Sequence, residues 1–157
     1  MSDEIHARIE VSQPRRWFGV GMLLFLGALL IYVALATPPT FEWQIFLIVT
    51  GAGALWIGDK MRRATAGSIE MTDDVIRDHN GGLIARLDEI ENVERGFLAF
   101  KPSNGFLIKT RTPGPRRWEP GLWWRVGRRI GVGGVTSASQ AKIMSDMISA
   151  RLIMSRE

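Results

Sequence analysis

The chain has 157 residues, a formal net charge of +4 and no cysteine. The absence of cysteine excludes disulfides, thiol nucleophiles and metal sites built on cysteine ligands. The sequence also lacks any arrangement of histidine, serine and carboxylate residues at a known catalytic or metal-binding spacing. It therefore predicts neither an enzyme nor a bound metal or cofactor.

Two uncharged apolar runs occupy most of the first third of the chain. They cover residues 17–36 and 43–58 and are separated by a hexapeptide with two prolines. Twenty helical residues rise about 30 Å, which is the thickness of a bilayer's hydrocarbon core. The second run is shorter, but Trp43 and Trp56 lie near its ends, where tryptophan favours the membrane interface. Because a backbone inside lipid must satisfy its own hydrogen bonds, the runs predict a transmembrane helical hairpin.

Basic residues flank this predicted hairpin, and its connecting hexapeptide has none. The flanking residues are Arg8, Arg15, Arg16, Lys60, Arg62 and Arg63. By the positive-inside rule both termini are expected in the cytoplasm. One alternative is that the runs are buried helices of a soluble protein. Another is that the first run is a signal peptide cleaved after residues 34–36, which its length and the acidic residues before it oppose.

These features divide the chain into four predicted segments. Residues 1–16 form a cytoplasmic N-terminal arm, residues 17–58 the transmembrane hairpin, residues 59–66 a basic linker and residues 67–157 a cytoplasmic domain. The last segment is long enough for one domain and not for two.

The predicted cytoplasmic domain begins with short runs in which polar and apolar residues alternate between turn signals. Strands are expected at residues 67–72, 75–77, 83–87, 97–100 and 106–111, with one or two more before residue 132. The sequence Asn80-Gly81-Gly82 predicts a tight hairpin, because asparagine and glycine accept a positive φ. A break in the chain is expected at Pro113-Gly114-Pro115.

The C-terminal segment changes to helical periodicity. Ser137 and Gln140 match a capping box, in which the serine caps the helix and the glutamine reaches back. Apolar residues then recur at three- and four-residue spacing, namely Ala141, Met144, Met147, Ile148 and Leu152. The sequence thus predicts an α+β chain: a two-helix transmembrane hairpin, then an antiparallel β-domain of six to seven strands with a C-terminal amphipathic helix.

Two short motifs follow the hairpin in a particular order. The first is the strand at residues 69–72 with an Asp-rich turn after it, and the second is the spacing of Leu87, Ile90 and Val93. This order resembles that of bacterial membrane proteins that carry a pleckstrin-homology-like (PH-like) domain, and the resemblance covers roughly residues 67–152. It implies a PH-like fold, a bacterial inner (plasma) membrane location and a binding or scaffolding module without catalytic residues.

Tryptophan and arginine interleave at residues 116–129, which we call the Trp-Arg segment. Its candidate binding residues are Arg116, Arg117, Trp118, Trp123, Trp124, Arg125, Arg128 and Arg129. Indole rings favour the headgroup region, and basic side chains are attracted to anionic lipid. The segment is therefore the predicted contact for anionic phospholipid or for a membrane protein partner. Alternatively, the tryptophans belong to the core and the arginines pair with the acidic residues concentrated at positions 70–94.

The same interleaving occurs on platforms for single-stranded nucleic acid. A membrane tether and a comparably acidic half of the domain oppose that interpretation, so no nucleic-acid partner is predicted.

Small residues line the two apolar runs. They include Gly19, Gly21 and Gly27 in the first run and Gly51 and Gly53 in the second. Small residues let helices approach closely, either within the hairpin or with a partner span. Neither run holds an ionisable residue, which argues against an ion path. The sequence therefore predicts a non-enzymatic membrane-anchored adaptor or, alternatively, an accessory subunit or assembly factor of a larger inner-membrane complex.

Overall fold

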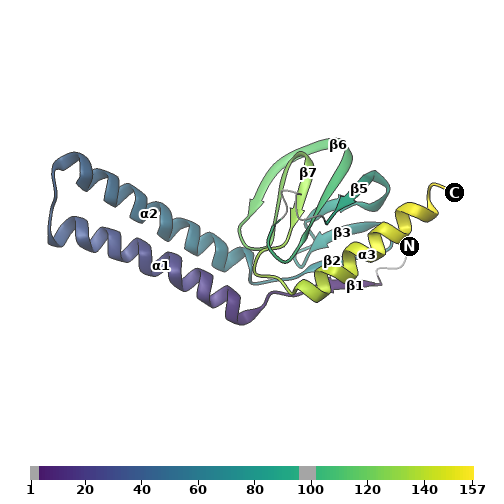
Figure 1. Ribbon diagram of the computed structural model, residues 1–157, viewed down its shortest axis with the longest axis horizontal. Helices are drawn as coiled ribbons and strands as arrows, with labels where there is room; N and C mark the ends of the chain where they lie inside the picture. Colours follow the sequence, from purple (N-terminus) through teal and green to yellow (C-terminus); the bar gives the residue numbers. More distant parts are fainter. Residues whose placement is uncertain (1–3, 96–101) are drawn as a thin grey trace. The chain divides into compact units, whose positions relative to one another are not determined.

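The computed structural model describes residues 4–95 and 102–157 and contains two compact units (Figure 1). One unit is a helical hairpin, residues 13–63. The other, here called the sheet domain, joins the residues before Gln13 to those from Ala64 onwards. The strand expected at residues 97–100 lies outside the described residues.

The helical hairpin consists of α1 (Gln13–Ala36) and α2 (Phe41–Ala64), each of 24 residues. Each helix rises about 36 Å and is long and apolar enough to cross a membrane. Both extend beyond the predicted runs, and most of the predicted linker at residues 59–66 is helix. Asp59 stabilises this extension, because its carboxylate pairs with Arg62 at 2.7 Å and with Arg63 at 3.1 Å, one turn further along.

Glycine brings the backbones of α1 and α2 into contact. A Cβ atom at Gly27 would lie 2.7 Å from the Gly51 carbonyl oxygen, and one at Gly51 would lie 2.9 Å from the Gly27 oxygen. Gly19 similarly faces the Met61 side chain. Gly21 and Gly53 differ, since a Cβ built there has no atom within 4 Å among the described residues, its chain neighbours and its own helix backbone aside. The five predicted glycines therefore divide into three at the helix contact and two in open space.

We expect Gly27→Ile to separate the helices, because its Cβ atom alone overlaps the Gly51 backbone and no rotamer relieves that overlap. The approach can be measured as disulfide yield between Leu23→Cys and Gly58→Cys, in a chain without native cysteine. A Cβ at position 58 lies 3.2 Å from the Leu23 Cβ, close to disulfide geometry. Gly27→Ile should lose most of the yield, and the control Gly21→Ile should retain it. Equal yields would contradict the contact.

The sheet domain contains two antiparallel sheets (Figure 1). The first has the order β1-β2-β3-β4, with bounds Ala7–Ile9, Ile69–Met71, Val75–Asp78 and Leu83–Arg86. A short 3₁₀ helix, η1 (Leu87–Glu89), leads to the second sheet. This sheet has the order β5-β6-β7, with bounds Ile90–Glu94, Phe106–Glu119 and Trp123–Val132. The chain ends with α3 (Ala138–Met154). The α+β class agrees with the sequence prediction. The described residues contain seven strands, but β1 and β5 were not expected at those positions.

Strand β1 precedes the helical hairpin in the sequence but pairs with β2, which follows it. Ala7 lies opposite Met71 and Ile9 opposite Ile69. The expectation of a separate N-terminal arm at residues 1–16 is therefore corrected: part of that stretch is a strand of the sheet, and its end is the first turn of α1. The physical reason is burial, since Ile9 is fully buried in the core of the sheet domain.

Two turn predictions have different outcomes. The Asn80-Gly81-Gly82 hairpin is confirmed between β3 and β4, with φ of +80° at Gly81. The break at Pro113-Gly114-Pro115 is wrong, because β6 continues through it to Glu119. Register shifts flank the pair Gly114–Gly127, and such irregular positions accommodate proline because ladder hydrogen bonds are already interrupted there.

Helix α3 forms where expected but without the predicted capping box. Ser137 is its N-cap residue and makes no side-chain capping bond. The side-chain amide oxygen of Gln140 instead accepts a hydrogen bond from the main-chain N–H of Glu10 at 2.7 Å, which ties α3 to the segment after β1. The predicted apolar face is buried at Ala141, Met144 and Ile148 and partly buried at its two other positions. These residues close a single core that both sheets share.

Candidate functional site

Beyond Thr110, β6 continues along the surface of the sheet domain and stays paired with β7 (Figure 1). Residues 106–110 are buried except at Lys109, whereas residues 111–118 are exposed except at the half-buried Gly114. The two strands are paired along this stretch, with Trp118 opposite Trp124. We call residues 111–129 the β6–β7 ribbon, and the whole Trp-Arg segment lies on it.

The three tryptophans of the ribbon have different environments. Trp123 is 2% exposed and belongs to the core, and its Nε1 atom has no hydrogen-bond partner among the described residues. Trp124 is half-buried with its indole ring against Gly131, where a Cβ atom would lie 2.3 Å from the ring. Trp118 is 42% exposed. Trp118 is therefore the tryptophan of the segment that can meet a ligand without unfolding the core.

Arg125 joins neighbouring strands. Its Nη1 atom donates to the carbonyl oxygen of Ile84 at 3.2 Å, which links β7 to β4. Its Nη2 atom lies 3.4 Å from the carbonyl oxygen of Thr112 in β6. The guanidinium group covers Gly114, where a Cβ atom would lie 2.2 Å from it. The guanidinium group of Arg125 thus serves to hold neighbouring strands together.

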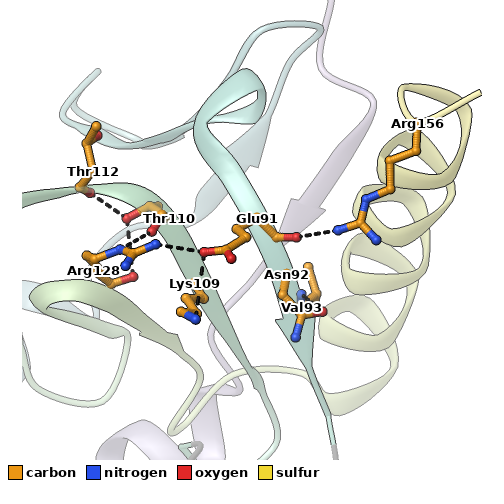
Figure 2. A network of polar contacts seen from close by, with 8 residues as sticks. All are labelled: Glu91, Asn92, Val93, Lys109, Thr110, Thr112, Arg128 and Arg156. Atoms are coloured by element: carbon orange, nitrogen blue, oxygen red, sulfur yellow. Dashed lines mark hydrogen bonds and ion pairs between the residues drawn. The ribbon is translucent and has the colours of Figure 1, made fainter.

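Arg128 belongs to a polar network around Glu91 (Figure 2). Its Nη2 atom lies 2.8 Å from the Glu91 carboxylate, and its Nε atom donates to the Thr110 carbonyl oxygen at 2.8 Å. Lys109 lies 3.7 Å from the same carboxylate, and Arg156 of α3 donates to the Glu91 carbonyl oxygen at 2.9 Å. The network joins all three strands of the second sheet to the last residues of the chain. Because its charges are partly exposed, it orients Arg128 more than it stabilises the fold.

The remaining arginines of the ribbon point their charge to the surface. Arg116 and Arg129 are exposed and make no polar contact with the described residues. Arg117 is exposed and lies over the Trp123 ring at 5.4 Å, with Glu119 at 3.5 Å. Arg111, which the sequence analysis did not single out, is also exposed and belongs to the same charged surface. Its sequence signal is a further basic residue on the predicted strand leading into the Trp-Arg segment.

The β6–β7 ribbon is strongly basic. It carries six arginines against the single acidic residue Glu119. Such a concentration of like charge raises the local positive potential and attracts anions. Among residues 4–95 and 102–157, no group of three or more histidine, aspartate or glutamate side chains is placed to hold a metal ion.

The surface available for binding is narrower than the predicted set of eight residues. Arg116, Arg117, Trp118 and Arg129 are exposed, whereas Trp123 is core and Trp124 is half-buried. Arg125 and Arg128 hold neighbouring strands together, although Arg128 is also exposed. No family model, curated protein or solved structure matches the chain.

Proposed function

We propose that the protein is a non-enzymatic membrane-anchored adaptor. Helices α1 and α2 anchor it in the bacterial inner membrane, and a PH-like sheet domain on the cytoplasmic side binds anionic lipid headgroups or a membrane protein partner through the β6–β7 ribbon. The observation that carries the proposal is the exposure of Arg116, Arg129 and Trp118 on one β-ribbon, in a chain whose two helices are long enough to cross a membrane.

The pairing of β1 with β2 supports a cytoplasmic location for both ends of the hairpin. These strands flank the hairpin in the sequence and belong to one sheet, which supports entry into and exit from the membrane on the same side. Arginine and lysine residues concentrate at those flanks, and basic residues favour the cytoplasmic side. Seven antiparallel strands followed by one helix support the PH-like assignment.

Energetics favour anionic lipid as the ligand of the ribbon. Each arginine near an anionic surface contributes about 1 kcal/mol, an effect that falls off within the Debye length of roughly 10 Å. An exposed indole ring adds a preference for the headgroup region. The helical anchor raises the effective concentration of the ribbon beside the bilayer, so weak contacts suffice for binding.

The test uses the full chain, reconstituted in vesicles of phosphatidylcholine with or without phosphatidylglycerol. An environment-sensitive fluorophore on Val126→Cys, an exposed position of the ribbon, reports contact with the bilayer. We expect a blue shift with phosphatidylglycerol that added salt reverses and that Arg116→Glu and Arg129→Glu each weaken. Lys142→Glu is the matched control, because Lys142 is exposed on α3 and outside the ribbon. Identical spectra in both vesicles would overturn the lipid proposal.

The alternative function is an accessory subunit or assembly factor of a larger membrane complex. It is favoured by Gly21 and Gly53, which leave open space on the helical hairpin where a partner span could approach. Purification of the full chain in mild detergent distinguishes this function. A partner that is lost from Gly21→Ile and Gly53→Ile but retained by Arg129→Glu would favour the subunit over the lipid-binding adaptor.

A further inference from the structure

A groove opens in the sheet domain between the start of β5, strand β6 and the last turns of α3. Its volume is about 490 Å³, within the range of roughly 300–1,000 Å³ typical of small-ligand sites. Arg111 lines the groove and is also the first residue of the β6–β7 ribbon, so the groove lies at the base of the ribbon. Arg116, Arg117 and Trp118 lie further along β6, toward its turn with β7, and do not line the groove.

The walls of the groove are mainly apolar. Leu87 and Leu152 are partly buried against the core, and Ile90 is fully buried beneath them. Met154 also lines the groove and is 67% exposed. Ile153, beside it, is exposed as well. Apolar surface that remains in contact with water gains free energy when a ligand covers it.

Among the charged residues that line the groove, the uncompensated charge is positive. Asp88 is compensated by Arg86 at 3.1 Å, and the hydrogen bond from Arg86 holds the pKa of Asp88 below its usual value. Arg151 is likewise compensated by the Asp73 carboxylate at 3.0 Å. Arg111 makes no polar contact with the described residues. A ligand of complementary charge therefore carries one acidic group.

The neighbouring strand edge is closed to an extended peptide. The main-chain N–H of Val93 donates to the Asn92 side chain at 2.9 Å, and the Glu91 carbonyl oxygen accepts from Arg156 at 2.9 Å (Figure 2). A peptide that adds to a sheet needs such backbone groups free. The groove thus suits a ligand that binds by apolar contact and one charge, without a backbone to pair.

We propose that this groove binds a single-chain lipid acid, with its alkyl chain against Leu87, Leu152 and Met154 and its carboxylate on the guanidinium group of Arg111. This assignment rests on the proposed function only for the source of the ligand, since an anchored domain lies beside a bilayer that can release lipid acids. A planar guanidinium group binds a carboxylate through paired hydrogen bonds, which gives the head group a defined position.

The experiment uses the full chain in phosphatidylcholine nanodiscs and palmitic acid with a photoactivatable diazirine near the chain end. After irradiation, adducts are mapped by peptide mass spectrometry. We expect adducts at the groove, competition by excess palmitate and no competition by methyl palmitate. Arg111→Gln should lower the adduct yield about tenfold or more, because the carboxylate loses its paired charged hydrogen bonds. The control Lys142→Gln, at an exposed basic residue outside both the groove and the ribbon, should leave the yield unchanged.

Three results would overturn the proposal: adducts confined to α1 and α2, equal yields from Arg111→Gln and the unchanged chain, or equal competition by the acid and its methyl ester. Met154→Asp provides an independent variant, since its exposed side chain can be replaced without disturbing the core, and its yield should also fall. Because the nanodiscs carry no anionic phospholipid, failure here is distinguishable from failure of headgroup binding by the ribbon.

Discussion

The sheet domain is expected to fold without the helical hairpin, provided that β1 is retained. A chain that joins residues 4–12 to residues 64–157 through a short Gly-Ser linker should be as well ordered as the full protein. Residues 64–157 alone should not, although they contain every other described strand and α3. The difference in stability between these two chains measures how much the segment that contains β1 contributes to the stability of the whole domain.

The contacts of β1 explain the size of this effect. Ile9 is fully buried, and truncating a buried isoleucine to alanine costs about 2–5 kcal/mol, against a total stability of about 5–15 kcal/mol for a typical domain. Two main-chain hydrogen bonds of the residues that flank β1 would also be lost. The N–H of His6 donates to the Met71 oxygen at 2.9 Å, and the N–H of Ser12 donates to the Val135 oxygen at 2.8 Å. The carboxylate of Asp73 adds a side-chain contact to His6 at 2.6 Å.

Urea unfolding followed by tryptophan fluorescence measures the effect, with near-ultraviolet circular dichroism to report tertiary packing. The linked chain should show a cooperative transition, and residues 64–157 alone should show none. Within the full chain, Ile9→Ala should lower the free energy of unfolding by about 2–5 kcal/mol. The matched control Ile5→Ala should change it little, because Ile5 is already 39% exposed. A cooperative transition in residues 64–157 alone would contradict the role of β1.

The sequence predicts the helices and most strands because strong local rules govern them. A helix that crosses lipid requires a long uncharged run, and a half-buried strand requires polar and apolar residues to alternate. Both patterns can be recognised in the sequence without knowledge of the fold. Strand β1 gives only three residues of alternation, and its partner strand lies some sixty residues later. The continuity of β6 through two prolines depends on its pairing with β7, which no local rule contains.

The candidate site was predictable as a segment but not as a set of free side chains. Composition alone locates the Trp-Arg segment. Long-range contacts decide which of its residues remain available: Arg125 reaches the Ile84 carbonyl oxygen, and Arg128 reaches Glu91. These partners are separated by about forty residues of sequence, so their proximity is a property of the fold. The groove beside Arg111 is hidden for the same reason, since its walls come from separate elements.

Replacing either of two tryptophans, only a few residues apart, should produce opposite phenotypes. Trp123→Ala removes a fully packed indole ring and is expected to lower the free energy of unfolding by about 3–5 kcal/mol. Trp118→Ala removes a 42% exposed ring and should cost far less stability. In the vesicle experiment Trp118→Ala is the variant with the expected effect: it should weaken the fluorescence response to phosphatidylglycerol while the domain stays folded.

Trp123→Phe separates packing from the unpaired indole N–H in the same measurement. A buried polar group without a partner costs about 1–3 kcal/mol, so phenylalanine removes that penalty while it keeps an aromatic ring in the core. Trp123→Phe should therefore destabilise the domain much less than Trp123→Ala in urea unfolding. If phenylalanine is as damaging as alanine, the indole N–H has a partner that stabilises the fold. If Trp118→Ala unfolds the domain instead, the ring is needed for the fold, and the proposed contact of Trp118 with the membrane surface is contradicted.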